Sequence, residues 1–426
     1  MNKIFYADLH IHSKYSRATS KKMELEEMSQ WCFKKGIHII ATGDFTHPAW
    51  IKELEHKLVQ AKNGLYVLKQ RLNIKSVSQA RNSKDTMVYF IPATEISFIY
   101  SKNKRCYRIH LIVIAPNLDL VKELNQVLGK IGNLKADGRP ILGLDVEEFA
   151  KIVFTLDSRF ILIPAHIWTP WFSLFGSRSG FDSIEECFGE QSKKIFALET
   201  GLSSDPIINW QWSALDKFQL ISNSDAHSLE KIGREANAFT GQISFNNLCN
   251  SLKTGRNFAY TIEFYPEEGK YHYTGHRLCK ICLSPKEAKK YKGICPKCKK
   301  PLTIGVAERA DQLADCVFGR KKKNFIPYKN LIPLATILSS VIGVGEKTKT
   351  VEKIYNQIID SFENEINALL NVNIKDLTEC AGKEIAQAIL AGREGRVEIK
   401  PGFDGEYGKV SVKSIQSFKK VQIQFF

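Results

Sequence analysis

The sequence predicts an α/β fold, in which a parallel sheet or barrel of the βα type is followed by a cysteine-rich module and a helical region. Short apolar, β-rich runs alternate with amphipathic helical patterns from residue 4 to about 265, which is typical of βα units. The character of the sequence changes at residues 266–278, just before two Cys-x-x-Cys pairs. The length of 426 residues also predicts two or three domains.

The elements follow in a regular order. Strands are expected at residues 3–11, 37–45, 86–97, 108–116, 159–167, 194–201, 218–227 and 257–264. Amphipathic helices are expected between several of them, such as those at residues 22–36 and 145–156. Residues 397–412 show two β-patterned runs around Gly and Asp-Gly, which predicts a hairpin. The expected domains are residues 1–265, 266–305 and 306–426.

The charge balance favours a polyanionic partner. The chain has 61 Lys and Arg against 45 Asp and Glu, a formal net charge of +16, which suits nucleic acid first and an anionic membrane surface second. A lysine-rich surface is the alternative, so charge alone decides nothing. No signal peptide is expected, because Asp8 and His10 interrupt the first apolar stretch, and the longest apolar runs are too short to span a bilayer. Six of the ten cysteines are scattered singly, which fits a reducing cytoplasm.

Histidines and carboxylates recur at the ends of the expected strands. His10 and His12 are one residue apart, so a strand presents both on one face, roughly 7 Å apart along the backbone. Strand ends that carry such residues predict a barrel with a metal-bearing mouth. Eight mixed nitrogen and oxygen ligands exceed the three or four of one catalytic zinc, so two or three divalent metals (zinc, manganese or magnesium) are expected. The expected ligands are His10, His12, Asp44, Glu95, His110, His166, Asp225 and His227.

The ordered motifs "DLHIHS", "TGD", "ATE", "RIHLI", "PAH" and "SDAH" resemble those of the polymerase and histidinol phosphatase (PHP) family. The resemblance implies a distorted barrel of seven β/α units, hydrolysis of phosphoesters with two or three metals, and a ligand role for the eight residues. Two departures stand out. Arg17 replaces an acid or histidine that the family often has, and Asp44 ends "TGD" where "TDH" is usual. The first departure removes a ligand, and Arg17 is expected to hold substrate phosphate instead.

The expected chemistry assigns three candidate catalytic residues. Metals lower the pKa of bound water and neutralise charge that develops on phosphate oxygens. Asp225 and His227 are expected to bind metal or to protonate the leaving oxygen, and Arg17 completes the catalytic set. Asp8 and Glu199 fit two interpretations about equally, a second layer that orients the ligand histidines or simple caps at strand ends.

The two cysteine pairs predict a structural zinc ribbon. Cys279, Cys282, Cys295 and Cys298 form a Cys-x2-Cys-x12-Cys-x2-Cys array, in which each pair presents two thiolates and the two pairs complete a tetrahedron. A redox dithiol is the alternative, and the spacing argues against it. The surrounding lysines either contact phosphates or form a solvated basic loop.

The region after the cysteines has two helical hairpin patterns. Gly343 and Gly345 form a turn between helical stretches, and Lys347 and Lys349 follow. The turn lacks the Gly-Lys-Ser/Thr order of a nucleotide P-loop. It resembles a helix-hairpin-helix element, whose backbone N–H groups hold a DNA phosphate, although an ordinary helical packing unit explains the stretch about as well. Residues 377–399 resemble a second, degenerate copy.

Two further stretches have less specific patterns. Trp168, Trp171 and Arg178 follow His166, and they are expected to stack on a displaced base or, more commonly, to pack as a lid. The last five residues resemble the short tail by which bacterial proteins dock on the sliding clamp, and a final β-strand is the competing interpretation. These residues are Gln422, Ile423, Gln424, Phe425 and Phe426.

Across essentially the full length, the order of barrel, four-cysteine module, basic helical region and tail is similar to that of the endonuclease Q family. The resemblance implies a repair nuclease that nicks damaged DNA 5′ of deaminated bases (uracil, hypoxanthine, xanthine) and of abasic sites, and the cysteine pattern adds a cytoplasmic location. Two other functions stay open. A PHP-type phosphatase for small phosphomonoesters explains the barrel but not the ribbon or the charge. A non-catalytic adaptor that binds DNA or the clamp leaves the ligand set unused.

Overall fold

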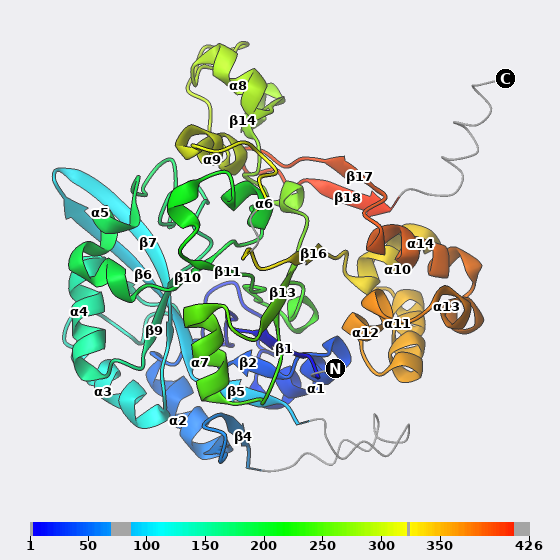
Figure 1. The fold of residues 1–426 in the computed structure, drawn as a ribbon, viewed down its shortest axis with the longest axis horizontal. Coiled ribbons are helices and arrows are strands. Elements are labelled where there is room, and N and C mark those ends of the chain that lie inside the picture. The colour runs from blue at the N-terminus through cyan, green and yellow to red at the C-terminus, as the bar shows by residue number, and fades with distance from the viewer. Residues whose placement is uncertain (1–2, 70–86, 322–323, 413–426) are drawn as a thin grey trace.

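The computed structural model describes residues 3–69, 87–321 and 324–412. Figure 1 shows a large lobe of strands and helices, a cluster of helices beside it at the C-terminal end, and the cysteine-containing segment at the top. The chain is therefore a mixed α/β protein with a helical C-terminal region, as the alternation of patterns predicts. Among the described residues, no helix combines the length and apolarity that a membrane span needs.

The largest sheet lies in the large lobe and is mixed rather than all parallel. β1 is parallel to β2, and β2 to β5, whereas β12 is antiparallel to β1. Its eight strands, in spatial order, are β16 (Tyr328–Asn330), β13 (Phe258–Glu263), β12 (Ala236–Phe239), β1 (Phe5–Asp8), β2 (Ile39–Ala41), β5 (Tyr89–Ile91), β4 (Tyr66–Leu68) and β3 (Leu58–Gln60).

A second sheet is built on a long hairpin. Asn103 and Lys104 both have positive φ, 52° and 63°, which suits the tight turn that joins two antiparallel strands. The spatial order is β8 (Ile141–Leu142), β6 (Ala93–Lys102), β7 (Arg105–Ile114) and β9 (Ile161–Pro164). A parallel pair, β10 (Ala197–Glu199) and β11 (Gln219–Ile221), continues from β9. A bridge between Ile11 and Ala226 returns to the residues that follow β1.

Helices surround these sheets and form the C-terminal region. α1 shows how the sequence sets an end: Gly36 follows it at φ 89°, and the Gly36 N–H donates to the Cys32 carbonyl, as in a left-handed helix cap. The helices of the large lobe are α1 (Leu25–Lys35), α2 (Pro48–Lys57), α3 (Leu118–Leu128), α4 (Val146–Leu156), α5 (Ile184–Phe188), α6 (Pro206–Asn209) and α7 (Phe245–Thr254). The later helices are α8 (Pro285–Tyr291), α9 (Val306–Leu313), α10 (Leu334–Ile342), α11 (Lys349–Phe362), α12 (Glu365–Leu370), α13 (Ile374–Ala381) and α14 (Lys383–Arg393).

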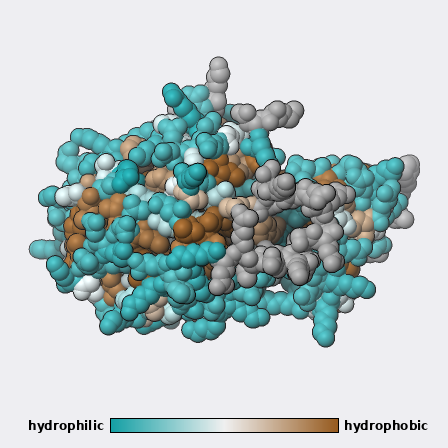
Figure 2. Space-filling view, turned by 90° about the horizontal axis from the view of Figure 1, so that it is seen from below, coloured by the Kyte–Doolittle hydropathy of each residue, from teal (hydrophilic) through white to brown (hydrophobic). Residues whose placement is uncertain are grey.

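Two small hairpins complete the fold. β14 (Thr274–His276) pairs with β15 (Ile281–Leu283) in the cysteine-containing segment, and β17 (Val397–Lys400) pairs with β18 (Lys409–Val412). The second pair confirms the predicted C-terminal hairpin. Figure 2 shows hydrophilic residues over most of the helical region, whereas hydrophobic residues form a band on the larger lobe.

A buried ion pair joins the helical region to the large lobe. Lys35, at the end of α1, places its Nζ 2.6 Å from Glu365 Oε2, and both side chains are nearly inaccessible. Glu365 also accepts hydrogen bonds from the Leu334 N–H at 3.0 Å and the Tyr355 hydroxyl at 2.7 Å. This carboxylate therefore holds α10, α11 and α12 against α1.

Replacing Glu365 with alanine is expected to lower the free energy of unfolding by about 3 kcal/mol, because the ammonium of Lys35 is left buried without a counter-ion. Chemical denaturation, followed by far-UV circular dichroism, measures the change. Lys217→Ala is the control, because its pair with Glu185 is solvent-exposed on both sides and should leave the transition unchanged. Equal effects of the two substitutions would contradict the role of the pair.

Candidate active site

Glu95 is the point on which several strand ends converge. It is buried in β6, and its two carboxylate oxygens face different groups. Oε2 lies 3.5 Å from His10 Nε2 and 3.3 Å from His12 Nε2. Oε1 lies 2.6 Å from His110 Nδ1 and 3.0 Å from His166 Nε2. Glu95 therefore stands between two pairs of imidazoles.

The first pair of imidazoles is joined by Asp225. Asp225 Oδ1 lies 3.2 Å from His12 Nε2 and 3.7 Å from His10 Nε2, and the four possible ligand atoms of this group lie within 4.8 Å of one another. His10 Nε2, His12 Nε2 and Asp225 Oδ1 are buried, and none of them hydrogen-bonds to a described residue. Unpaired buried polar atoms are costly, and a divalent cation between them gives each a partner.

The second group consists of Glu95, His110 and His166, whose possible ligand atoms also lie within 4.8 Å of one another. His110 Nδ1 lies 3.2 Å from His166 Nε2. Because Glu95 belongs to both groups through different oxygens, the described residues fit two divalent metals that share one carboxylate. The donor set thus suits two metals, the lower of the two numbers expected from the sequence.

Two carboxylates lie behind the first histidine pair and orient it. Glu199 faces His10 Nδ1 at 3.0 Å and accepts a hydrogen bond from the His166 N–H at 2.8 Å. Asp44 Oδ1 faces His12 Nδ1 at 3.1 Å. A partner on one ring nitrogen fixes which nitrogen is free for a metal. Asp8 instead accepts hydrogen bonds from the backbone N–H groups of Ser224 and Gly233, so it ties the segment after β11 to the end of β1.

Asp44 and His227, two expected metal ligands, lie outside both groups. Asp44 Oδ2 is occupied by the N–H and hydroxyl of Ser13, at 2.6 and 2.7 Å. His227 directs Nδ1 at the Asp225 carbonyl oxygen, 2.9 Å away, and its ring lies 4.4 Å from the His12 ring. A third of the His227 side chain is exposed, so this imidazole lies at the edge of the site.

The backbone is strained at three of the expected ligands. Asp44, His166 and Asp225 have φ of 48°, 32° and 47°, a region that residues other than glycine rarely adopt. Gly201 leaves room for His166, since a Cβ there would lie 2.4 Å from the His166 Cβ. Strained residues of this kind cluster at functional sites, where the surrounding structure holds them.

Electrostatics keep the carboxylate that both groups share ionised. Burial alone would raise the pKa of Glu95, but its interactions with His110, Arg139 and His10 hold it well below its usual range. Burial lowers the pKa of His110 to about 4, so this ring is neutral at pH 7. Neutral imidazole and ionised carboxylate are the forms that bind a metal.

Arg139 is a residue of the site for which the sequence carries no motif. Its Nη1 lies 3.0 Å from Glu95 Oε2, and its side chain is only 30% exposed. The loop that carries it is held in place, because the Gly138 N–H donates to the Tyr15 carbonyl at 3.0 Å. Gly138 also packs so closely on Asp44 that a Cβ would lie 2.4 Å from its Oδ2. Arg139 therefore presents a permanent positive charge beside the two metal-ligand groups.

Arg17, the expected phosphate contact, lies elsewhere. Its side chain is 78% exposed, and its Nε lies 3.3 Å from Asp137 Oδ2. The same carboxylate accepts from the backbone N–H of Arg139. The structure thus brings Arg139 to the ligand groups, whereas Arg17 supports the outer side of the same loop.

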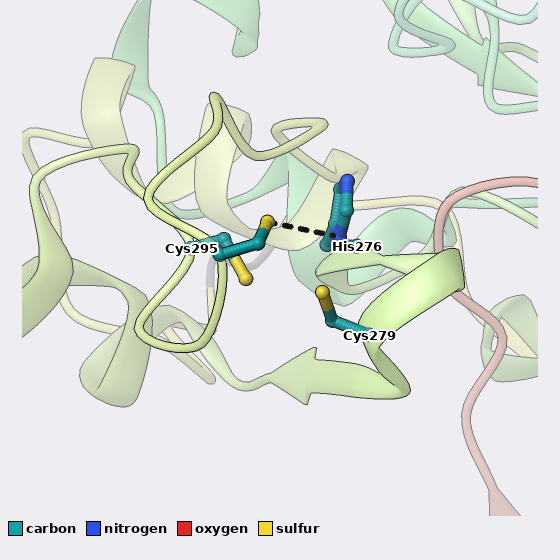
Figure 3. A group of neighbouring side chains, drawn as sticks. His276, Cys279 and Cys295 are labelled. Atoms are coloured by element: carbon teal, nitrogen blue, oxygen red, sulfur yellow. Dashed lines mark hydrogen bonds between the residues drawn. The ribbon is translucent and has the colours of Figure 1, made fainter.

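The cysteine-containing segment brings together a different set from the four predicted cysteines. The ligand atoms of His276, Cys279, Cys295 and Cys298 lie within 4.8 Å of one another. Figure 3 shows His276, Cys279 and Cys295 around a common centre. Cys298 Sγ lies 3.7 Å from His276 Nδ1. This set suits one tetrahedral zinc with three thiolates and one imidazole.

Cys282 lies outside this group for a local reason. It lies within β15 directly opposite Gly275, one residue from the position that faces His276. Burial raises the pKa of Cys282, with further contributions from Glu287 and Glu406. The Cys-x-x-Cys spacing is therefore present, but the second thiol belongs to the strand rather than to the turn.

Replacing Cys279 with serine is expected to remove the zinc of this segment, whereas Cys282→Ser should retain it. Zinc content of the purified variants measures the difference. In cobalt-substituted protein, His276→Cys should shift the absorption bands toward those of four thiolates. Loss of zinc in Cys282→Ser to the same extent as in Cys279→Ser would contradict the His276 assignment.

The three predicted DNA contacts near His166 lie in different environments. Trp168 is 1% exposed, and its Nε1 donates to Asn209 Oδ1 at 2.7 Å, so stacking of a base on Trp168 is contradicted. Arg178 donates to the Leu302 carbonyl at 3.0 Å and ties this loop to the cysteine-containing segment. Trp171 remains partly exposed, with its ring against Tyr271.

The predicted turn of the helical region lies between α10 and α11. Gly343 ends α10 at φ 79°, with open space where a Cβ would lie, and Gly345 and Lys347 precede α11, which begins at Lys349. Lys347 Nζ lies 2.6 Å from Glu230 of the large lobe. Phosphate binding at this turn stays a prediction. The predicted clamp-binding tail lies outside the described residues.

Comparison with solved structures decides the family. A lesion-specific endonuclease from Pyrococcus furiosus, PfuEndoQ, is 30% identical, covers 98% of this chain and 99% of its own, and superposes with a TM-score of 0.82. The chain belongs to the endonuclease Q family. It is accordingly a nuclease. A structure of endonuclease Q with a 27-mer duplex that carries an abasic lesion at the active site is 31% identical, with 97% of this chain and all of that chain covered and a TM-score of 0.82.

Two sequence comparisons agree with membership of the endonuclease Q family. Protein MJ0043 of Methanocaldococcus jannaschii is 35% identical over an alignment of 290 positions, which covers 64% of this chain. The chain spans only 36% of the length of that relative. The MJ0043 C-terminal domain family matches residues 333–396, the helices α10 to α14.

Proposed function

We propose that this endonuclease Q homologue is a metal-dependent DNA repair enzyme that hydrolyses the phosphodiester 5′ of deaminated bases (uracil, hypoxanthine, xanthine) and of abasic sites. The two ligand groups that share Glu95 carry the proposal, because they occur in a chain that matches a lesion-specific endonuclease over almost its whole length. The solved complex of a family member with a duplex that carries an abasic lesion supports DNA as the substrate class.

The proposal includes the architecture expected from the PHP resemblance. Residues 1–265 would form the catalytic barrel, residues 266–305 a zinc module, and residues 306–426 a DNA-binding region. The succession of β1, β2, β5, β6, β7, β9, β10 and β11, with a bridge back to Ile11, supports a distorted closed arrangement with the ligands at one mouth.

Each residue of the site has a task in the proposed reaction. Divalent metals held by the two groups would lower the pKa of bound water and would neutralise charge on the phosphate. Glu95 holds both groups together, and Asp225 completes the first. Arg139 binds a non-bridging phosphate oxygen, because a guanidinium matches phosphate geometry. His227, half-buried at the edge, would transfer a proton to the leaving oxygen.

The residues behind the ligands hold the histidine rings in their orientation. Glu199 and Asp44 hold His10 and His12 with Nε2 toward the centre, which removes the need for the rings to reorganise during the reaction. The damaged nucleotide would leave the base stack to bring its phosphate to this depth, and unstacking is least costly for a damaged or missing base.

A lesion panel tests the proposal. End-labelled duplexes with one uracil, hypoxanthine, xanthine or abasic site, and an undamaged duplex, are incubated with the purified protein and Mg²⁺, Mn²⁺ or Zn²⁺. Nicking of lesion-containing duplexes alone is expected. Activity on a chromogenic phosphomonoester that equals or exceeds activity on every duplex would instead favour the small-molecule phosphatase.

A further inference from the structure

The loop of the C-terminal hairpin is docked on the segment that leads into β14. Tyr273 donates its N–H to the Gly402 carbonyl at 2.9 Å. Three glycine N–H groups of the loop donate back over 2.7–3.1 Å, from Gly402 to Glu267, from Gly405 to Lys270 and from Gly408 to Glu268. Figure 1 shows β17 and β18 running toward β14.

This docking leaves no room for adjustment of the loop. A Cβ on Gly408 would lie 2.1 Å from the Glu267 carbonyl, and one on Gly402 would lie 2.5 Å from the Gly269 carbonyl. The backbone of the loop is therefore held in place by close contacts on the segment that leads into β14. Tyr407, between these contacts, is 78% exposed, so a large aromatic ring is presented to solvent on a rigid support.

Tyr407 belongs to a row of aromatic and basic residues. Lys270 Nζ lies 5.9 Å from the centre of the Tyr407 ring and 5.5 Å from that of the Tyr271 ring. The Tyr271 ring meets the Trp171 ring edge-on, with centroids 5.5 Å apart. We call Trp171, Tyr271, Lys270 and Tyr407 the aromatic strip.

The aromatic strip begins at the active site. Phe172, the neighbour of Trp171, places its ring 4.8 Å from the ring of His110. The Trp171 carbonyl accepts a hydrogen bond from Thr169, whose hydroxyl also lies 3.3 Å from His166 Nδ1. The strip is thus continuous with the second metal-ligand group.

The charge on the aromatic strip is positive. Arg277 lies beside the loop, where a Cβ on Gly405 would lie 3.7 Å from its Nη1. Both acidic residues of the loop already have partners: Asp404 accepts a hydrogen bond from the Arg277 backbone N–H at 2.6 Å, and Glu406 forms an ion pair with Lys280 Nζ at 2.8 Å. Lys280 thus offsets the charge of Glu406, and Lys270 and Arg277 are the cations that a polyanion would meet beside Tyr407.

We infer that the aromatic strip binds the DNA strand that leads away from the active site. Tyr407 stacks on a base of this strand, and the ammonium of Lys270 contacts one of its phosphates. The inference rests on the proposed function and names the surface that this site uses to hold its substrate. A base without its normal stacking partner gains a replacement in a fixed aromatic ring, and the lysine adds affinity that does not depend on sequence.

Equilibrium binding of a uracil-containing duplex tests the aromatic strip. Full-length protein with Asp225→Asn keeps the duplex intact during fluorescence anisotropy. Adding Tyr407→Ala should weaken binding roughly 10-fold, whereas Tyr407→Phe should bind within about 2-fold of its parent. Lys270→Ala should lower the slope of log Kd against log salt by about one. Lys194→Ala, a lysine over the Phe154 ring on α4, is the matched control and should change neither quantity.

Unchanged binding by Tyr407→Ala, or a change in salt slope that Lys194→Ala reproduces, overturns the inference. Failure of the proposed function is a separate result. If the wild-type protein nicks no lesion-containing duplex, the enzyme assignment fails, whereas loss of duplex binding in Tyr407→Ala still supports the aromatic strip.

Discussion

Glu95→Gln is expected to abolish metal loading at both ligand groups and to reduce nicking by on the order of 10³-fold or more. The substitution preserves the size of the side chain but removes the charge that both groups share. Metals supply several kcal/mol of stabilisation to such a reaction, and each 1.4 kcal/mol corresponds to tenfold in rate. Metal content by elemental analysis and single-turnover nicking rates on a uracil duplex measure the two effects together.

Glu199→Gln is the matched control for Glu95→Gln. Its carboxylate orients His10 from behind and lies in neither ligand group, so the expected loss is about 10- to 100-fold in metal affinity or rate. Retention of both metals by Glu95→Gln, or equal losses in the two variants, would show that Glu95 does not bridge the groups.

Arg139→Ala is expected to lower kcat by about 10²- to 10³-fold, while the metal content stays that of the wild-type protein. A donor aimed at charge that develops in the transition state typically contributes this much. Arg139→Lys should recover only part of the rate, because an ammonium cannot make the two parallel contacts of a guanidinium. Single-turnover kinetics with saturating duplex separate this effect from weaker binding.

Arg17→Ala provides the control within the same loop system. Arg17 contacts Asp137, as the Arg139 backbone does, but its side chain is exposed and no contact joins it to Glu95 among the described residues. Its removal should leave kcat within about twofold of wild type. If Arg17→Ala lowers kcat as much as Arg139→Ala does, Arg17 is the phosphate contact, as the sequence predicts.

The strand-end ligands could be predicted because local sequence determines them. His10 and His12 follow an apolar strand, and Asp225 follows another. An alternating strand limits where such side chains can lie, and parallel neighbours bring their ends together. The α/β alternation, the C-terminal hairpin and the helical region follow from patterns of the same local kind.

Asp44 and Cys282 are residues whose roles cannot be predicted from local sequence patterns. The sequence places Asp44 at a strand end, but only the folded structure brings Ser13 to its oxygens. Cys282 has the correct spacing from Cys279, yet the strand register places His276 in the ligand group. His276 stands three residues before Cys279, outside the Cys-x-x-Cys pattern, and a single histidine there carries no signal that distinguishes it from a surface residue.

Arg139 and Trp168 depend on long-range packing. Arg139 reaches Glu95 across 44 residues of sequence, and no spacing rule connects the two. Trp168 lies in an aromatic run that suits base stacking, but its indole N–H donates a hydrogen bond to Asn209 and the side chain is buried. Aromatic clusters beside a site pack inward as readily as they face a ligand, and the sequence does not separate these outcomes.

The position of the nick shows whether the protein is a lesion-directed nuclease. A 5′-labelled duplex with one uracil is incubated with wild-type protein and Mn²⁺, and the products are resolved at single-nucleotide resolution beside Glu95→Gln and an undamaged duplex. A single cut at the phosphodiester 5′ of the uracil, absent in both controls, is the predicted result. Cutting of the undamaged duplex to the same extent, or an equal cut by Glu95→Gln, would contradict a lesion-directed nuclease built on Glu95.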